Sequence, residues 1–220
     1  MSIRQNLLTI QNDLPEQVTL VAVSKTKPVS DLMEAYEAGQ RIFGENKIQE
    51  MAGKFEQMPK DTEWHMIGHV QTNKVKFMAP FVGLIHGVDS LKLLEEINKQ
   101  ALKNNRIIDC LLQIHIAEEE TKFGLDENEL LEILKSETFQ NLKNVSIKGL
   151  MGMATFTEDN HQIKKEFTHL KTIYDKVNQL SIANYPLSIL SMGMSGDYKI
   201  AIDCGSTMVR IGSSIFGTRS

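Results

Sequence analysis

The sequence has too few cysteines for a disulfide-stabilised scaffold. Only two occur in 220 residues, Cys110 and Cys204, and they lie far apart without a CxxC partner. Both are therefore expected to be buried thiols in a reducing compartment. The first residues, MSIRQNLLTIQNDLPEQ, contain no apolar segment of signal-peptide length, so the expected location is the cytoplasm.

Long hydrophobic runs and an excess of positive charge are also missing. The longest stretch without charged residues, 177–196, contains Asn178, Asn184, Pro186 and several serines, which argues against a membrane span. Lysine and arginine total 24 against 28 acidic residues, and the net charge of −4 argues against a nucleic-acid-binding role. A hydrophobic fraction of 41% is ordinary for a globular protein with one full core.

What the sequence does contain is eight short apolar runs, which alternate with segments of helical periodicity. The runs are nearly continuous in hydrophobicity, as expected for parallel strands that are covered on both faces. They occupy residues 19–26, 41–46, 63–68, 83–89, 107–116, 145–154, 187–195 and 208–217.

Helix signals separate these runs. Ser30 is the expected N-cap of a helix that stops at Gly39, and Asp126 with Glu129 forms a capping box for another. Further helices are expected at residues 2–12, 91–101, 163–177 and 197–203.

This alternation, without linkers or repeats, predicts an α/β protein with a single domain over residues 1–220. The expected fold is one (β/α)8 TIM barrel with an extra N-terminal helix. The alternative is an open doubly wound sheet in which two of the short runs are not strands. In a barrel, the carboxyl ends of the strands form the functional face, where we expect Lys25, Asn46, His65, His86 with Asp89, Met153, Ser195 and Gly212.

Lys25 follows the apolar run VAV at the end of the first expected strand. One interpretation is a lysine whose stem is buried and whose ammonium reaches water. The other is a lysine in the barrel mouth that forms a Schiff base with a carbonyl, for which a neutral amine is needed. Lys27, two residues later and directly before Pro28, is the competing candidate and is more typical of a loop.

Two stretches rich in glycine and serine, SMGMSGD (191–197) and RIGSSIFG (210–217), follow or end the last two expected strands. Successive backbone N–H groups of small residues bind anions, and barrels often hold phosphate after strands seven and eight. The spacing does not fit a hydrolase elbow or a P-loop, and His65 and His69 do not form a metal motif. Arg210, inside an apolar run, is expected to point into the barrel mouth or to pair with a carboxylate.

The motifs AVSKTKP, FGEN, WHMIGHVQTNK, GLMGMA and LSMGMSGDYKIAIDCGSTMVRIGSSIFG closely resemble those of the pyridoxal 5′-phosphate (PLP) homeostasis proteins. The resemblance covers nearly the whole chain. It implies a PLP-binding barrel of fold type III, similar to the barrel domain of alanine racemase without its second domain. By this resemblance Lys25 forms the Schiff base with PLP, and Arg210 faces the pyridine nitrogen. Ser195, Gly196, Gly212 and Ser213 hold the phosphate, while Asn46, His65, Ser191, Met192 and Met194 surround the ring.

The resemblance and the chemistry together favour a carrier or buffer of PLP over an enzyme. An arginine cannot support a charge on the pyridine nitrogen. Of the four tyrosines, Tyr36 and Tyr174 lie on helix stripes, Tyr185 lies in a loop, and Tyr198 is expected near the phosphate, so a second base is absent. The expected partners are PLP and, transiently, apo-enzymes that use it, and the expected state is a monomer without metal.

Two alternatives remain open at this point: a weak or narrow amino-acid racemase that uses PLP, and a phosphosugar-binding barrel enzyme. The segment IHIAEEETKFG (114–124) differs from the version usual in the family, although Lys122 and Gly124 keep their places.

Overall fold

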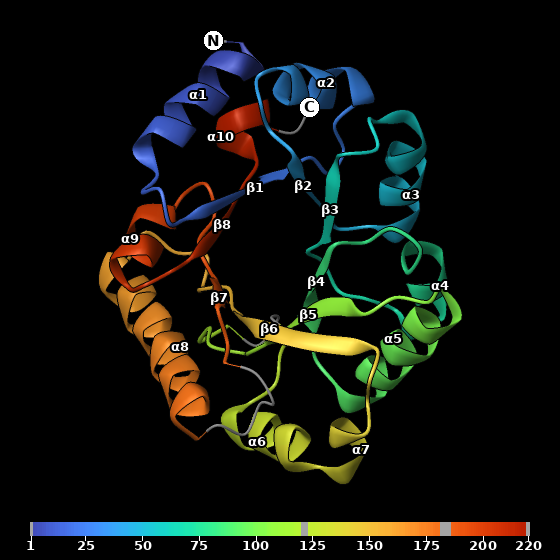
Figure 1. Ribbon diagram of the computed structural model, residues 1–220. Coiled ribbons are helices and arrows are strands. Elements are labelled where there is room, and N and C mark those ends of the chain that lie inside the picture. The colour runs from blue at the N-terminus through green and yellow to red at the C-terminus, as the bar shows by residue number, and fades with distance from the viewer. Residues whose placement is uncertain (1, 120–122, 181–185, 219–220) are drawn as a thin grey trace.

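The computed structural model describes residues 2–119, 123–180 and 186–218. Within them, eight parallel strands close into a barrel in the order of the chain, and the helices surround it (Figure 1). The strands are β1 (Thr19–Val23), β2 (Ile42–Glu45), β3 (Glu63–Met66), β4 (Leu84–Val88), β5 (Ile108–Gln113), β6 (Val145–Met151), β7 (Ile189–Ser191) and β8 (Met208–Ile211).

Pairing of the first strand with the last closes the barrel. In this pair Thr19 lies opposite Met208 and Ala22 lies opposite Ile211, both in parallel register. The predicted (β/α)8 barrel is therefore confirmed, and the alternative of an open sheet is wrong.

The helices alternate with the strands along the chain, as the periodicity predicted. The long helices α5 and α8 pack along the outside of the barrel, and α1 lies beside α10 (Figure 1). The helices are α1 (Ile3–Asp13), α2 (Val29–Glu37), α3 (Ile48–Gln57), the 3-10 turn η1 (Thr72–Lys74), α4 (Val75–Met78), α5 (Leu91–Lys103), α6 (Glu127–Lys135), α7 (Glu137–Gln140), α8 (Asn160–Leu180), α9 (Tyr198–Asp203) and α10 (Ser213–Phe216).

Two of the predicted helix boundaries can be checked against the caps. The capping box of Asp126 and Glu129 is present at the start of α6. The N-cap prediction for Ser30 is wrong, because α2 begins at Val29 and Pro28 is its N-cap. The carbonyl of Pro28 accepts the N–H of Asp31 at 3.0 Å, and a proline is well suited to this place because its φ is fixed.

The strands are shorter than several of the apolar runs. The run 208–217 contains β8 only as far as Ile211, and its remainder forms α10 after a break at Gly212. The run 187–195 contains the three-residue strand β7. Apolar side chains in these loops are buried too, so hydrophobicity alone overestimates strand length.

Side chains along each strand alternate between two apolar layers. Leu20 and Ala22 of β1 belong to the large layer that also contains the inner faces of the helices. Val21 belongs to a small cluster with Leu84 and Met208 inside the barrel. Successive residues of a strand point to opposite faces, which explains the division.

Both cysteines are buried free thiols, as predicted. Burial raises the pKa of Cys110, which keeps that thiol protonated and unreactive. No helix among the described residues is both long enough and apolar enough to cross a membrane.

Candidate functional site

A pocket of about 600 Å³ opens at the carboxyl ends of the strands. This volume suits a small organic ligand. Most of the predicted site residues line it, namely Lys25, Asn46, Met194, Ser195, Gly196, Arg210, Gly212 and Ser213.

Three predicted site residues do not line this pocket. His65 and Ser191 are buried inside the barrel within β3 and β7, and Met192 packs in the large apolar layer. His65 and His86 also lie within their strands, and not at the strand ends where we expected them. Contact of His65, Ser191 or Met192 with a ligand stays a prediction.

Lys25 lies in the turn that directly follows β1. Its two neighbours are held through their backbone, since Lys54 Nζ donates to the carbonyl of Ser24 at 2.8 Å and Thr26 N–H donates to Glu50 Oε1 at 2.6 Å. Thr26 has a φ of +65°, which is unusual for a β-branched residue and strains the backbone. The strained turn is therefore fixed on both sides of Lys25.

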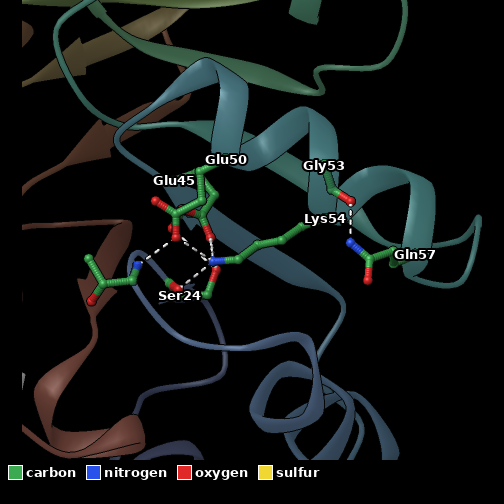
Figure 2. Close-up of polar contacts among 8 residues, drawn as sticks. Ser24, Glu45, Glu50, Gly53, Lys54 and Gln57 are labelled. Carbon is green, nitrogen blue, oxygen red and sulfur yellow. Dashed lines mark hydrogen bonds and ion pairs between the residues drawn. The ribbon is translucent and has the colours of Figure 1, made fainter. Parts of the chain in front are cut away.

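Lys54 is the centre of a buried ionic cluster, here called the Lys54 cluster, with Ser24, Glu45 and Glu50 (Figure 2). Its Nζ lies 2.7 Å from Oε1 of Glu45 and 2.7 Å from Oε1 of Glu50. Ser24 Oγ donates to the same Glu45 oxygen at 2.6 Å. All three ammonium donors thus have acceptors, as a buried lysine requires.

The two carboxylates of the Lys54 cluster differ in their surroundings. Burial raises the pKa of Glu45, although Lys54 and Ser24 oppose this shift. Burial also acts on Glu50, but hydrogen bonds from Lys54 and the Thr26 N–H outweigh it and lower its pKa. Sequence reasoning missed the cluster, because no motif marks Lys54 on α3 as buried.

The two loops rich in glycine and serine meet at one side of the pocket. Ser195 Oγ accepts hydrogen bonds from the N–H groups of Gly212 at 3.2 Å and Ser214 at 3.4 Å. Within the described residues, the N–H groups of Ser195, Gly196 and Ser213 have no hydrogen-bond acceptor. These donors could receive an anion.

Close packing requires glycine at two positions of these loops. A Cβ on Gly212 would lie 3.0 Å from the carbonyl oxygen of Val23, and Gly193 has a φ of +97°. Asp197 fixes the first loop by accepting the Met194 N–H at 2.5 Å, and burial raises the pKa of this carboxyl. Asp197 lines the pocket as well, which the sequence analysis did not predict.

Arg210 extends from β8 to the pocket wall and is 4% exposed. Its Nη1 donates to Ser191 Oγ at 2.6 Å, and its Nη2 donates to the carbonyl of Gly152 at 3.1 Å. Burial lowers its pKa to about 10, so the guanidinium keeps its charge at neutral pH. Of the two places expected for Arg210, the barrel mouth or a carboxylate, the structure shows the barrel mouth.

The wall also contains Met153, which was expected on the functional face, and residues that the sequence analysis missed, including Gln113, Phe123, Thr155 and Phe156. They lie at the end of β5 and in the loops after β5 and β6, and no local motif distinguishes them. Glu166 of α8 anchors the second loop by accepting from the N–H and the hydroxyl of Thr155, each at 2.7 Å.

The tyrosines of the described residues point away from the pocket. Tyr36 donates to Asp61, Tyr174 to the carbonyl of Leu187, and Tyr198 to Asp13 of α1. Tyr198 was expected near the loops rich in glycine and serine. Its backbone directly follows the first of these loops, but its hydroxyl points to α1. Tyr185 and Lys122 lie outside the described residues, within which no group of histidine, cysteine and acidic side chains is arranged for a metal.

Three features together define a class of small-molecule-binding TIM barrels. They are the closed parallel barrel, the lysine after its first strand, and the loops after its last two strands that present backbone N–H groups. The family model described as "Alanine racemase, N-terminal domain" matches residues 1–220. The chain belongs to this family and, within it, to the pyridoxal phosphate homeostasis proteins.

Curated relatives cover nearly the whole chain. The pyridoxal phosphate homeostasis protein of Pasteurella multocida is 39% identical over 100% of this chain and 98% of its own length. The protein of the same name from Aquifex aeolicus is 40% identical over 91% of this chain and 86% of its own.

Solved structures agree with the fold. PipY of Synechococcus elongatus without PLP is 33% identical, has a TM-score of 0.92, and covers 98% of this chain and 100% of its own. The PLP-bound structure of the same protein has a TM-score of 0.89. Alanine racemase of E. faecalis, at 17% identity and a TM-score of 0.79, shares the fold over 58% of its length.

Proposed function

We propose that this protein binds PLP in the pocket and serves intracellular PLP homeostasis as a carrier or buffer. The proposal includes a monomer that acts in the cytoplasm and transfers PLP transiently to apo-enzymes. It rests on one observation above all, which is that Lys25 and the free amides of two loops line the same pocket. The names of the relatives and the PLP bound to PipY support it.

The groups around the pocket fit the functional groups of PLP. Lys25 carries a primary amine, which holds an aldehyde through a Schiff base. The N–H groups of Ser195, Gly196 and Ser213 supply hydrogen-bond donors for the phosphate. Arg210 supplies a buried donor for the ring nitrogen.

The same residues argue for storage and against catalysis. Bound PLP supplies an electrophilic aldehyde and, in PLP enzymes, an electron sink. Arg210 only donates hydrogen bonds, so it would leave the ring nitrogen of a bound PLP without a proton and would weaken that sink. The pocket has no tyrosine within the described residues that could serve as a second base.

Reduction with borohydride tests the proposal, because it makes a Schiff base permanent. Wild-type protein incubated with PLP and reduced is expected to gain the mass of the cofactor on the peptide that contains Lys25. Lys25→Ala should lose this gain. The matched control is Lys27→Ala, since Lys27 also lines the pocket while its Nζ donates to the carbonyl of Thr218. A mass gain that survives Lys25→Ala and disappears in Lys27→Ala would contradict the assignment.

The second candidate is an amino-acid racemase that uses PLP, favoured by the barrel shared with alanine racemases and by a lysine in the pocket. Incubation of the loaded protein with L-amino acids in deuterated water separates the two functions. A carrier leaves the α-protons in place, whereas sustained exchange above the rate of free PLP would support the racemase.

A further inference from the structure

A continuous chain of polar side chains crosses the interior of the barrel. His86 Nδ1 lies 3.1 Å from Ser191 Oγ, and His86 Nε2 lies 3.0 Å from His65 Nδ1. His65 Nε2 in turn lies 2.9 Å from Glu63 Oε1. Since Arg210 donates to Ser191, five side chains are joined from Glu63 to Arg210, and they are called the interior chain here.

The interior chain connects the two openings of the barrel. Glu63 is the first residue of β3, at the end of the barrel away from the pocket, and half of its side chain is exposed. Arg210, at the other end, lines the pocket. His65, His86 and Ser191 between them are almost completely buried.

Barrel interiors are usually filled with branched apolar side chains. Apolar residues such as Leu84, Leu111 and Met151 do fill part of this one. A polar group in such surroundings destabilises the fold unless it is hydrogen-bonded. The interior chain satisfies every ring nitrogen, which indicates a role beyond filling space.

The two ends of the interior chain determine where its protons lie. The guanidinium of Arg210 can only donate, and the ionised carboxylate of Glu63 can only accept. Ser191 Oγ accepts from Arg210 and is then free to donate its own proton to His86 Nδ1. His86 therefore carries its proton on Nε2 and donates to His65, which carries its proton on Nε2 and donates to Glu63.

The reversed arrangement, in which His65 donates to His86 and His86 donates to Ser191, is unfavourable. It requires either a bare nitrogen of His65 against the Glu63 carboxylate or a second proton on His65, which would add a charge inside the barrel. Burial lowers the pKa of His86 well below its usual value, and the charge of Arg210 adds to this shift. Hydrogen bonding to His65 lowers the pKa of Glu63, so the acceptor end stays ionised.

We propose that Glu63, His65, His86 and Ser191 are positioning residues, which hold one fixed tautomer of both histidines and thereby fix the guanidinium of Arg210 at the pocket wall. The tautomers are a property of the protein without ligand. The effect on a bound cofactor rests on the proposed function.

The tautomers are measured by nitrogen-15 NMR of the histidine rings in the protein freed of cofactor, at about pH 7. Both His65 and His86 are expected to be neutral, with the proton on Nε2. A cationic His86, or a proton on its Nδ1, would overturn the proposal whether or not the protein binds PLP.

Variants at the exposed end avoid disruption of the core. Glu63→Gln retains an oxygen that accepts from His65, so both tautomers should persist. Glu63→Leu removes the acceptor, and the Nδ1 and Nε2 resonances of His65 should move toward a tautomer mixture. Identical spectra for the two variants would contradict a directional chain.

The pocket end is tested by Ser191→Ala, with Ser206→Ala as the matched control. Ser206 is also buried, but its hydroxyl donates to backbone carbonyls such as that of Met192 and takes no part in the interior chain. Ser191→Ala should shift the absorption maximum of bound PLP and change the His86 resonances, whereas Ser206→Ala should do neither. Equal spectra for the two variants would show that Ser191 has only a structural role.

Discussion

At the scale of single residues, Lys54 holds the backbone on both sides of Lys25. Its ammonium holds the carbonyl that precedes Lys25 and binds Glu50, which in turn holds the N–H that follows Lys25 (Figure 2). The Lys54 cluster thus fixes the backbone direction of the turn.

Removal of the Lys54 ammonium should strongly destabilise the protein. Lys54→Met leaves Glu45 buried without a cation, and breaking a buried ion pair in this way costs about 3–5 kcal/mol. Urea denaturation measures the loss in the free energy of unfolding. The matched control is Lys99→Met, which breaks an exposed pair with Glu96 and should cost less than about 1 kcal/mol.

A second substitution tests the reason for this loss. Adding Glu45→Gln to Lys54→Met removes the unpaired charge, so part of the stability should return. If the double variant were as unstable as the single variant, the loss would come from packing of the lysine stem and not from the charge.

At the scale of elements, α8 supports the loops at the pocket rim through one carboxylate. Glu166 accepts hydrogen bonds from Thr155 in the loop after β6 and from the N–H of Glu118 in the loop after β5. Burial opposes the ionisation of Glu166, but these hydrogen bonds outweigh it and lower its pKa.

The lowered pKa of Glu166 predicts a pH dependence of stability. The carboxylate contributes stability above the ordinary carboxyl pKa of 4.5, and this contribution is lost as the pH falls through the lower pKa of the folded state. The gap in unfolding free energy between wild type and Glu166→Gln should therefore shrink below pH 4.5. Urea denaturation at pH 6 and at several lower values measures it.

Glu158→Gln is the control for this pH series, because Glu158 is an exposed carboxylate of the same loop. Its gap to wild type should stay small at every pH. A gap for Glu166→Gln that is independent of pH would show that the carboxylate charge does not anchor the loops.

The close contact between β6 and β7 predicts that replacing Gly149 by alanine destabilises the protein. A Cβ at this position would lie 1.7 Å from the carbonyl oxygen of Ile189, so alanine would force the two strands apart. Overpacking of this kind costs about 1–3 kcal/mol or more, and thermal unfolding followed by circular dichroism should show a lower Tm.

Gly53→Ala, within helix α3, should have the opposite effect on stability. Nothing lies within 4 Å of a Cβ built on Gly53 in α3, and alanine in a helix is more stable than glycine by about 0.5–1 kcal/mol. The same measurement should therefore show a raised Tm. A lower Tm for both glycine variants would contradict this account of the packing.

At the scale of the whole molecule, closure of the barrel brings the parts of the pocket together. Pairing of β1 with β8 places the turn of Lys25 beside Gly212, although 186 residues lie between these two residues in the sequence. Ligand binding should consequently stabilise the fold as a unit.

The predicted stabilisation follows from mass action. PLP at 100 times its Kd should add about 2.7 kcal/mol to the free energy of unfolding. This corresponds to a rise in Tm of roughly 5–11 °C for a chain of this size. All variants are compared at one PLP concentration, 100 times the Kd of the wild type. Differential scanning fluorimetry should then show this rise for wild type and for Lys27→Ala, and a smaller rise for Lys25→Ala. Equal rises in all three would place the main binding energy away from Lys25.

The strands, most helices and the strand-end positions of Lys25, Asn46, Ser195 and Gly212 could be derived from the sequence, because periodicity and turn chemistry are local. The place of Met194 was implied only by the family resemblance. The lengths of the strands could not be derived in this way, since loops such as the one that contains Ser195 bury apolar side chains without pairing as strands. Ser30 was misplaced because a proline two residues earlier starts the helix.

The sequence by itself determined the alternation of strands with helices and the lysine after the first strand, because apolar runs and helix signals are local patterns, whereas the pairing of β1 with β8 decided that the sheet closes into a barrel. Only the tertiary structure decided the partners of His65, His86 and Lys54. Apart from Glu63 beside His65 and Glu50 beside Lys54, their partners lie on other strands, helices and turns, and such contacts depend on which elements face one another after the barrel closes.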